Sequence, residues 1–166
     1  EDVAHVCVSC SHRQHIKEYA VVRHLRKTIE QPFIHDKIIA DQECSRKRPD
    51  VYFDLPDRVV IVEIDEHQHK TYDEGCSCAR MCEIVAAIGG RSVVFIRYNP
   101  DSCKWKGKAF KVHPAERIDL LVNVVKDEIA REISGFEVKL MQLWYDDDLE
   151  EYTLCKIEDT TYLVAI

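Results

Sequence analysis

Two uninterrupted runs of apolar residues constrain the fold of this chain more than any other feature of its sequence. One is Val59–Val62 (Val-Val-Ile-Val), and the other lies within Ser92–Ile96 (Ser-Val-Val-Phe-Ile). Both are far too short to span a bilayer, and the first lacks the apolar–polar alternation of a strand with one solvated face. We therefore expect two β-strands, of which the first is buried on both faces.

The remaining predicted elements indicate an α/β fold with a central mixed β-sheet flanked by helices. Apolar residues at helical spacing predict the helices, and short apolar or alternating segments between turn signals predict the strands. We expect one domain over residues 14–166, because its length suits a single core and no repeat or linker interrupts it. In chain order, the sequence predicts a helix at 14–30, strands at 33–39, 48–53 and 59–65, a helix at 78–88, a strand at 92–97, a helix at 114–133, a strand at 136–145, and a strand or loop at 152–166.

The charge of the chain is negative overall but unevenly distributed. The net charge of −7 argues against a protein that simply coats nucleic acid, because phosphate binding favours a basic face. It does not exclude a nuclease, because a catalytic metal site itself needs carboxylates. The sequence shows no secretion signal and no membrane span, and since it begins with Glu1 rather than Met we expect a piece of a longer protein.

Carboxylates stand where two neighbouring predicted strands meet. Asp50 begins one strand, and the next strand ends in Glu63-Ile64-Asp65. If the two strands form a hairpin, their polar ends converge at one rim of the sheet, and Glu63 and Asp65 share a face because side chains in a strand repeat every two residues. Clustered carboxylates repel one another unless a cation neutralises them, and hard oxygen ligands suit Mg²⁺. The alternative is an ordinary turn next to a solvated strand end.

Two histidines follow the second strand. His69 can act as a general acid or base near neutral pH, because the unperturbed pKa of histidine is about 6.5. His67 would share a face with His69 if the strand continues, and the pair could then chelate a metal. The alternative for His67 is a side chain packed on the sheet or pointing the other way.

The segment Arg48–Tyr72 resembles the PD-(D/E)XK (restriction-endonuclease-like) superfamily. The residues that carry the resemblance are Arg48-Pro49-Asp50, then Val62-Glu63-Ile64-Asp65-Glu66, His69 and Tyr72-Asp73. It extends more weakly over Lys17–Asp101. The very-short-patch-repair-like endonucleases are the most similar branch, together with domains of large DNA viruses and protists that are often attached to Cys/His-rich repeats. The resemblance implies a metal-dependent endonuclease that hydrolyses phosphodiester bonds in DNA with Mg²⁺ or Mn²⁺.

The resemblance also assigns roles to individual residues. It makes Asp50 and Glu63 ligands of Mg²⁺, helped by the backbone carbonyl of Ile64, and makes His69 the acid or base near the scissile phosphate. Asp65 stands where many members of the superfamily have a catalytic lysine, which puts a lysine-type mechanism in doubt. Two further carboxylates match catalytic positions of the branch: Glu18 on the first helix and Asp73 after Tyr72.

Eight cysteines are many for a chain of this length, and without secretion signals we interpret them as reduced thiols. Cys7-x-x-Cys10 has the spacing of half a zinc site, with His12 and His15 nearby. We expect a zinc-binding segment at 1–13 that shares one structural Zn²⁺ with two thiolates from the next segments, or the remnant of an upstream finger. Cys82, Cys103 and Cys155 are expected to be ordinary buried residues. The candidate thiolates beyond the pair are Cys44, Cys76 and Cys78.

Basic residues offer candidate contacts to nucleic acid, and the stretch around Trp105 could also stack on a base or be a plain solvated loop. Two other functions remain open. One is a catalytically inactive, zinc-stabilised module that binds nucleic acid or protein, which Asp65 in place of lysine and the net acidity favour. The other is an RNA endonuclease. The candidate nucleic-acid contacts are Arg46, Lys47, Arg48, Lys70, Arg80, Lys104, Lys106 and Lys108.

Overall fold

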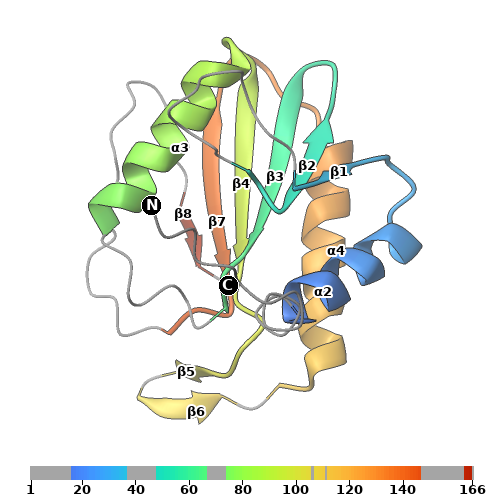
Figure 1. Ribbon diagram of the computed structural model, residues 1–166, viewed down its shortest axis with the longest axis vertical. Coiled ribbons are helices and arrows are strands. Elements are labelled where there is room, and N and C mark those ends of the chain that lie inside the picture. The colour runs from blue at the N-terminus through green and yellow to red at the C-terminus, as the bar shows by residue number, and fades with distance from the viewer. Residues whose placement is uncertain are drawn as a thin grey trace, which may run out of the picture.

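A six-stranded mixed β-sheet with helices on both faces forms the centre of the molecule, so the predicted α/β class is confirmed (Figure 1). The computed structural model describes residues 16–36, 48–66, 74–105, 107–110, 112–146 and 163–165. Over this part of the chain, no helix has the length and apolar character needed to cross a membrane.

The sheet combines an antiparallel and a parallel half, in the strand order β1-β2-β3-β4-β7-β8. In the antiparallel half, β2 pairs with β1 on one side and with β3 on the other. In the parallel half, β3, β4, β7 and β8 run in the same direction. The strands are β1 (Ile34–His35), β2 (Val51–Asp54), β3 (Arg58–Ile64), β4 (Ser92–Tyr98), β7 (Val138–Leu143) and β8 (Leu163–Ala165).

Each face of the sheet carries its own apolar core, because the parallel half is covered on both sides. Helices α2 (Ile16–Thr28) and α4 (Pro114–Ala130) cover one face. Helix α3 (Glu74–Ile88) covers the other, where Ile84 packs against Ile61 and Phe95. The side chains of Val59, Val60, Ile61 and Val62 are all 0% exposed, which confirms the expectation of a strand buried on both faces.

The carboxyl ends of the parallel strands β3, β4 and β7 lie at one edge of the sheet, which we call the carboxyl edge. Strand β2 runs the other way, so its first residues reach the same edge. Open α/β sheets bind ligands at such an edge, where the strands end and the loops begin.

Several elements differ from the sequence prediction. Strand β1 has only two residues, because Asp36 adopts a positive φ of 53° that ends the extended conformation. The chain after β4 forms a small hairpin of β5 (Cys103–Trp105) and β6 (Lys108–Phe110), for which no strands were predicted from the sequence. Gly107 has a φ of 70° there and allows the tight turn. Helix α3 begins at Glu74, four residues before the predicted start.

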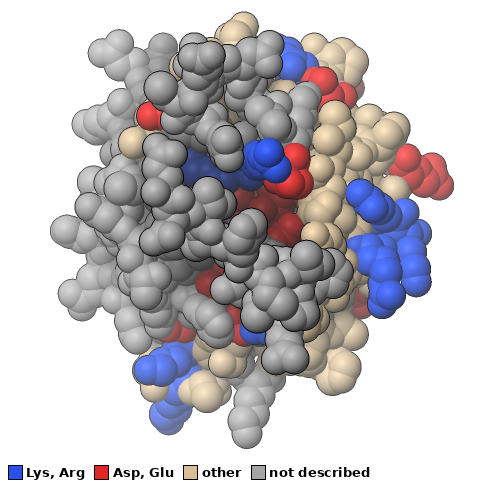
Figure 2. Space-filling model, in the orientation of Figure 1, with Lys and Arg blue, Asp and Glu red and all other residues tan. Residues whose placement is uncertain are grey.

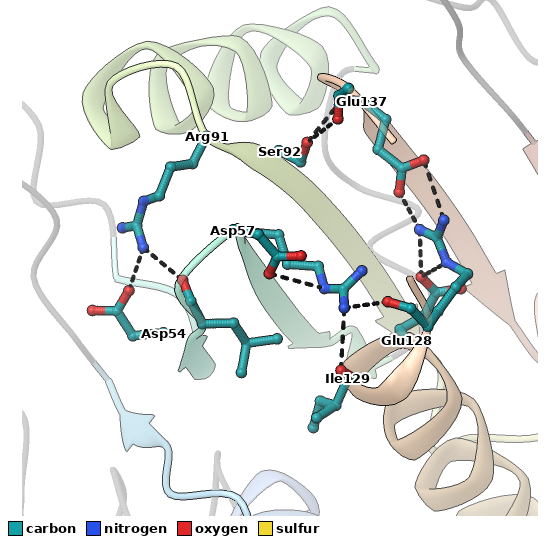
Figure 3. Close-up of polar contacts among 11 residues, drawn as sticks. Asp54, Asp57, Arg91, Ser92, Glu128, Ile129 and Glu137 are labelled. Atoms are coloured by element: carbon teal, nitrogen blue, oxygen red, sulfur yellow. Dashed lines mark hydrogen bonds and ion pairs between the residues drawn. The ribbon is translucent and has the colours of Figure 1, made fainter. Parts of the chain in front are cut away.

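Ion pairs and hydrogen bonds tie the opposite end of the sheet together (Figure 3). Arg58 begins β3 and donates to the carbonyl oxygens of Ile129 and Arg131 at the end of α4. The buried carboxylate of Glu128 accepts from Lys139 of β7 at 2.5 Å. At the start of β4, Arg91 donates to the exposed carboxylate of Asp54 at 2.7 Å. These contacts lie away from the carboxyl edge and fasten α4 and the β2–β3 turn to the sheet.

Candidate active site

Asp50 and Glu63 face each other across β2 and β3 at the carboxyl edge. Val51 is paired with Val62, so the next pair outward in the antiparallel register is Asp50 with Glu63. Both side chains lie on the α3 face, because Tyr52 and Ile61, two residues away in each strand, belong to the core under α3. The predicted pairing of the two strands is therefore confirmed, and Asp50 and Glu63 lie on one face of the sheet at the same rim.

The backbone of β3 fixes the orientation of the Asp50 carboxylate. Its Oδ2 atom accepts a hydrogen bond of 2.7 Å from the backbone N–H of Ile64. The backbone N–H of Asp36 donates in turn to the Asp50 carbonyl oxygen at 3.1 Å. Asp50 lies directly before β2 and is thus held by hydrogen bonds between the ends of β1 and β3 rather than in a free turn.

Arg80 of α3 is the direct partner of the Glu63 carboxylate. Its Nη2 atom lies 3.0 Å from Oε1 and 3.3 Å from Oε2 of Glu63, and 3.2 Å from the carbonyl oxygen of Arg48. The Glu63 side chain is only 12% exposed, whereas that of Arg80 is 38% exposed. Arg80 therefore reaches from solvent to Glu63, one of the two predicted metal ligands.

Burial raises the pKa of both carboxyl groups, because removing water destabilises the charged form. The pKa of Asp50 rises to about 6, where the Ile64 N–H offsets part of the burial effect and the charge of Glu18 adds to it. The pKa of Glu63 rises to about 8, since burial outweighs the attraction of Arg80 and the charge of Asp50 adds to it. Burial is thus the largest cause of both shifts, and the neighbouring carboxylates add to it.

Asp65 makes its contacts with the neighbouring strands. Its Oδ2 atom accepts from Nε of Arg97 at 2.5 Å and from the hydroxyl group of Tyr145. Arg97 belongs to β4, and Tyr145 follows β7, so three strand ends meet at this carboxylate. Asp65 is 1% exposed, and burial next to it raises the pKa of Tyr145 above the ordinary range. The phenol therefore remains a hydrogen-bond donor.

Glu18 and His35 form a pair at the side of the site. Glu18 of α2 lies with its Oε1 atom 2.8 Å from Nε2 of His35 in β1, and both side chains are mostly buried. The charge of Glu18 is among the causes that raise the pKa of Asp50, so the predicted helix glutamate lies within electrostatic reach of the predicted metal ligand. Tyr19 packs its ring edge-on against His35, with ring centroids 5.6 Å apart.

Three residues of this edge were missed in the sequence analysis: His35, Arg97 and Tyr145. Arg97 left a signal, because it alternates with the buried residues Val93 and Phe95 and so points to the same face as Glu63. His35 and Tyr145 left none that pointed to the site, since Tyr145 lies 80 residues from its partner Asp65.

The predicted nucleic-acid contacts divide between the site and the surface. Arg80 lies in the site, the exposed Arg48 pairs with Asp36 at 3.1 Å, and Lys104 is exposed on the β5–β6 hairpin, as is Lys108. The remaining predictions stay predictions. They concern residues outside the described part of the chain, or side chains not described there: His69, Asp73, Lys70, Arg46, Lys47, Lys106, Cys7, Cys10, Cys44, Cys76 and Cys78.

The pair Asp50 and Glu63 suits a hard divalent cation. No group of three His, Cys, Asp or Glu side chains that could hold a metal occurs among the described residues. Mg²⁺ needs fewer, because it keeps several waters and is commonly held by one or two carboxylates together with substrate phosphate. Figure 2 shows acidic side chains set back from the surface near the middle of one face, with basic side chains beside them.

Comparison with models of known protein families, with curated proteins and with solved structures found no match to this chain. The arrangement of side chains at the carboxyl edge is therefore what bears on function.

Proposed function

We propose that this chain is a metal-dependent endonuclease with a restriction-endonuclease-like core, which hydrolyses phosphodiester bonds in DNA. The observation that carries the proposal is the opposition of Asp50 and Glu63 on one face of the sheet, at the edge where strands end. Both carboxyl groups have raised pKa values, because burial disfavours their charged form and the neighbouring carboxylates add to that effect. A bound divalent cation would stabilise the charged form of both groups.

Asp50 and Glu63 are the residues that would hold Mg²⁺ or Mn²⁺. Such an ion would lower the pKa of attacking water and stabilise the negative charge that develops on the phosphate. The backbone N–H of Ile64 donates to Asp50 and fixes its orientation, and Arg80 forms an ion pair with Glu63. His69 remains the proposed acid or base, and Zn²⁺ on Cys7 and Cys10 the proposed structural metal.

DNA as the substrate rests on the resemblance to the repair-type endonucleases and on where the basic groups lie. Arg80 extends from the site toward solvent, and the β5–β6 hairpin carries the exposed Lys104 and Lys108 beyond the carboxyl edge (Figure 1). Cations at these positions can contact phosphates on either side of the scissile bond. The same chemistry would cleave RNA, so both polymers belong in the test.

The test is a cleavage assay on plasmid, duplex and single-stranded oligonucleotides of DNA and RNA with Mg²⁺ or Mn²⁺. The variant is Asp50→Asn, which removes the charge and keeps the shape. A matched control is Asp54→Asn, because Asp54 lies on the same face of the same strand but at its exposed far end. We expect cleavage by the wild type and by Asp54→Asn and none by Asp50→Asn; equal behaviour of wild type and Asp50→Asn would refute the proposal.

A second function, an inactive binding module on a nuclease-like fold, is favoured by one observation. The Asp65 side chain, at the position of the superfamily lysine, is an acceptor for Arg97 and Tyr145 and brings no positive charge of its own. A protein of this kind would bind oligonucleotide in the presence of Ca²⁺ and cleave none with Mn²⁺, and Asp50→Asn would leave its binding unchanged.

A further inference from the structure

Arg97 brings a buried positive charge into the candidate active site from the neighbouring strand. In the parallel register of β3 and β4, Arg97 is the direct partner of Glu63. Its side chain points to the α3 face, as Val93 and Phe95 do, and is 15% exposed. Burying a guanidinium is costly unless it is paired, so its position here requires specific partners.

Asp65 and Tyr145 fix the orientation of that guanidinium. Asp65 accepts the Nε–H of Arg97 at 2.5 Å, and the same oxygen accepts the hydroxyl group of Tyr145. The ring of Tyr145 lies under the guanidinium, with its centroid 5.8 Å from Cζ. Two donors converge on one carboxylate oxygen, and an aromatic face supports the charge. The arrangement holds Arg97 next to Glu63 on the side where the metal ligands stand.

We propose that Arg97 is the cation that contacts the scissile phosphate in this site, and that Asp65 is a positioning residue that holds Arg97 there. This inference rests on the proposed endonuclease function. Position 65 carries a carboxylate instead of lysine, and Arg97 places a positive charge one strand away on the same face as Glu63. Arginine can pair with a carboxylate and a phosphate together, because its guanidinium carries five N–H groups in a planar fork.

The role predicts a large effect on the chemical step and a small one on metal binding. A preorganised donor to charge that develops in the transition state accounts for about 100- to 1000-fold in rate. We therefore expect Arg97→Lys to slow single-turnover cleavage of a DNA oligonucleotide by about 100-fold in Mn²⁺. Mn²⁺ binding, followed by electron paramagnetic resonance, should stay as in the wild type. Arg91→Lys is the matched control at the far end of β4, where Arg91 pairs with Asp54, and it should cleave at the wild-type rate.

A double-mutant cycle separates positioning by Asp65 from a merely structural role. If Asp65 acts through Arg97, Asp65→Asn slows the single-turnover rate in the wild-type background and has little effect in the Arg97→Lys background. If Asp65 has only a structural role, Asp65→Asn should lower the single-turnover rate by a similar factor in both backgrounds. It should also lower the melting temperature by a similar amount in both. If Arg97→Lys does not fold, the double variant Asp65→Asn with Arg97→Gln takes the place of Arg97→Lys in the rate comparison. This double variant removes both charges together.

Two results would overturn the inference in distinguishable ways. If the Arg97 variants cleave at the wild-type rate while Asp50→Asn is inactive, Arg97 does not contact the phosphate, and the proposed function stands. If the wild type itself neither cleaves nor binds the oligonucleotide with Mn²⁺ or Ca²⁺, the proposed function and the role of Arg97 fail together.

Discussion

Individual acidic side chains of the candidate active site differ in their partners. Glu18 is paired with His35, Glu63 with Arg80 and Asp65 with Arg97, whereas the Asp50 carboxylate accepts from the backbone N–H of Ile64. Asp65 is paired with Arg97. Burial raises the pKa of Asp50 and of Glu63, and the charges of neighbouring carboxylates add to that effect.

The stability of the metal-free protein should therefore fall as the pH rises. In the folded chain the pKa values of Asp50 and Glu63 are about 6 and about 8, above their ordinary values of 3.8 and 4.5. From about pH 4 to about pH 8 the folded state binds more protons than the unfolded state, so the free energy of unfolding decreases over this range and levels off above it. In EDTA, the melting temperature should therefore decrease by several degrees between about pH 4 and about pH 8.

Two comparisons test this assignment. Glu63→Gln should flatten the pH profile between about pH 5 and pH 8, because the amide cannot lose a proton. Asp127→Asn, at an exposed position of α4, should leave the profile unchanged. Added Mg²⁺ should raise the melting temperature of the wild type more at pH 8 than at pH 5, since protons compete for the same oxygens. A wild-type profile that stays flat or rises over this range would contradict the assignment.

At the scale of elements, the contacts between α4 and β7 can be altered without touching the site. Glu128 is 4% exposed and accepts from Lys139 of β7 and from Arg131 just beyond the end of α4. Removing one partner of a buried ion pair leaves an uncompensated charge, whereas replacing both by apolar groups can be neutral. Glu128 therefore fastens this helix to the sheet only together with its partners.

We expect Glu128→Ala to lower the free energy of unfolding by about 3 kcal/mol, because it leaves the mostly buried Lys139 without this carboxylate. Glu128→Leu combined with Lys139→Leu should cost less than Glu128→Ala alone. Urea denaturation measures both, and Mn²⁺ binding at the carboxyl edge should be unchanged in each folded variant. A double variant less stable than the single one would mean that packing rather than charge controls this contact.

The elements that could be predicted from the sequence are those whose pattern is local and strong. The run Val59–Val62 identified a doubly buried strand, and the spacing of Asp50 and Glu63 on a hairpin brought both carboxylates to one rim. The hairpin at Cys103–Phe110 was missed, because its lysines suggested a solvated loop and its turn depends on the backbone freedom of Gly107. His35 and Tyr145 were missed because only tertiary packing brings distant segments beside Glu18 and Asp65.

At the scale of the whole molecule, a net charge of −7 means that any approach to nucleic acid must depend on local basic groups. The β5–β6 hairpin carries such groups and projects beyond the carboxyl edge (Figure 1). Its base is fixed, because the backbone N–H of Lys104 donates to Asp146 after β7 at 2.6 Å. The exposed lysines of the hairpin are thus held at the same edge of the sheet as the candidate site.

Charge reversal on this hairpin should weaken DNA binding in a salt-dependent way. Each lost lysine–phosphate contact reduces the salt slope, the dependence of log affinity on log salt, by about one, and it does so for all sequences alike. We expect Lys104→Glu with Lys108→Glu to lower affinity for duplex DNA in Ca²⁺ and to reduce the slope by about two. Lys126→Glu, at an exposed position of α4, provides the control and should change neither quantity beyond the effect of net charge. Fluorescence anisotropy measures the affinity and the salt slope from 50 to 200 mM salt, about the range over which such contacts respond. An unchanged slope in the hairpin variant would mean that DNA binds on another face of the molecule.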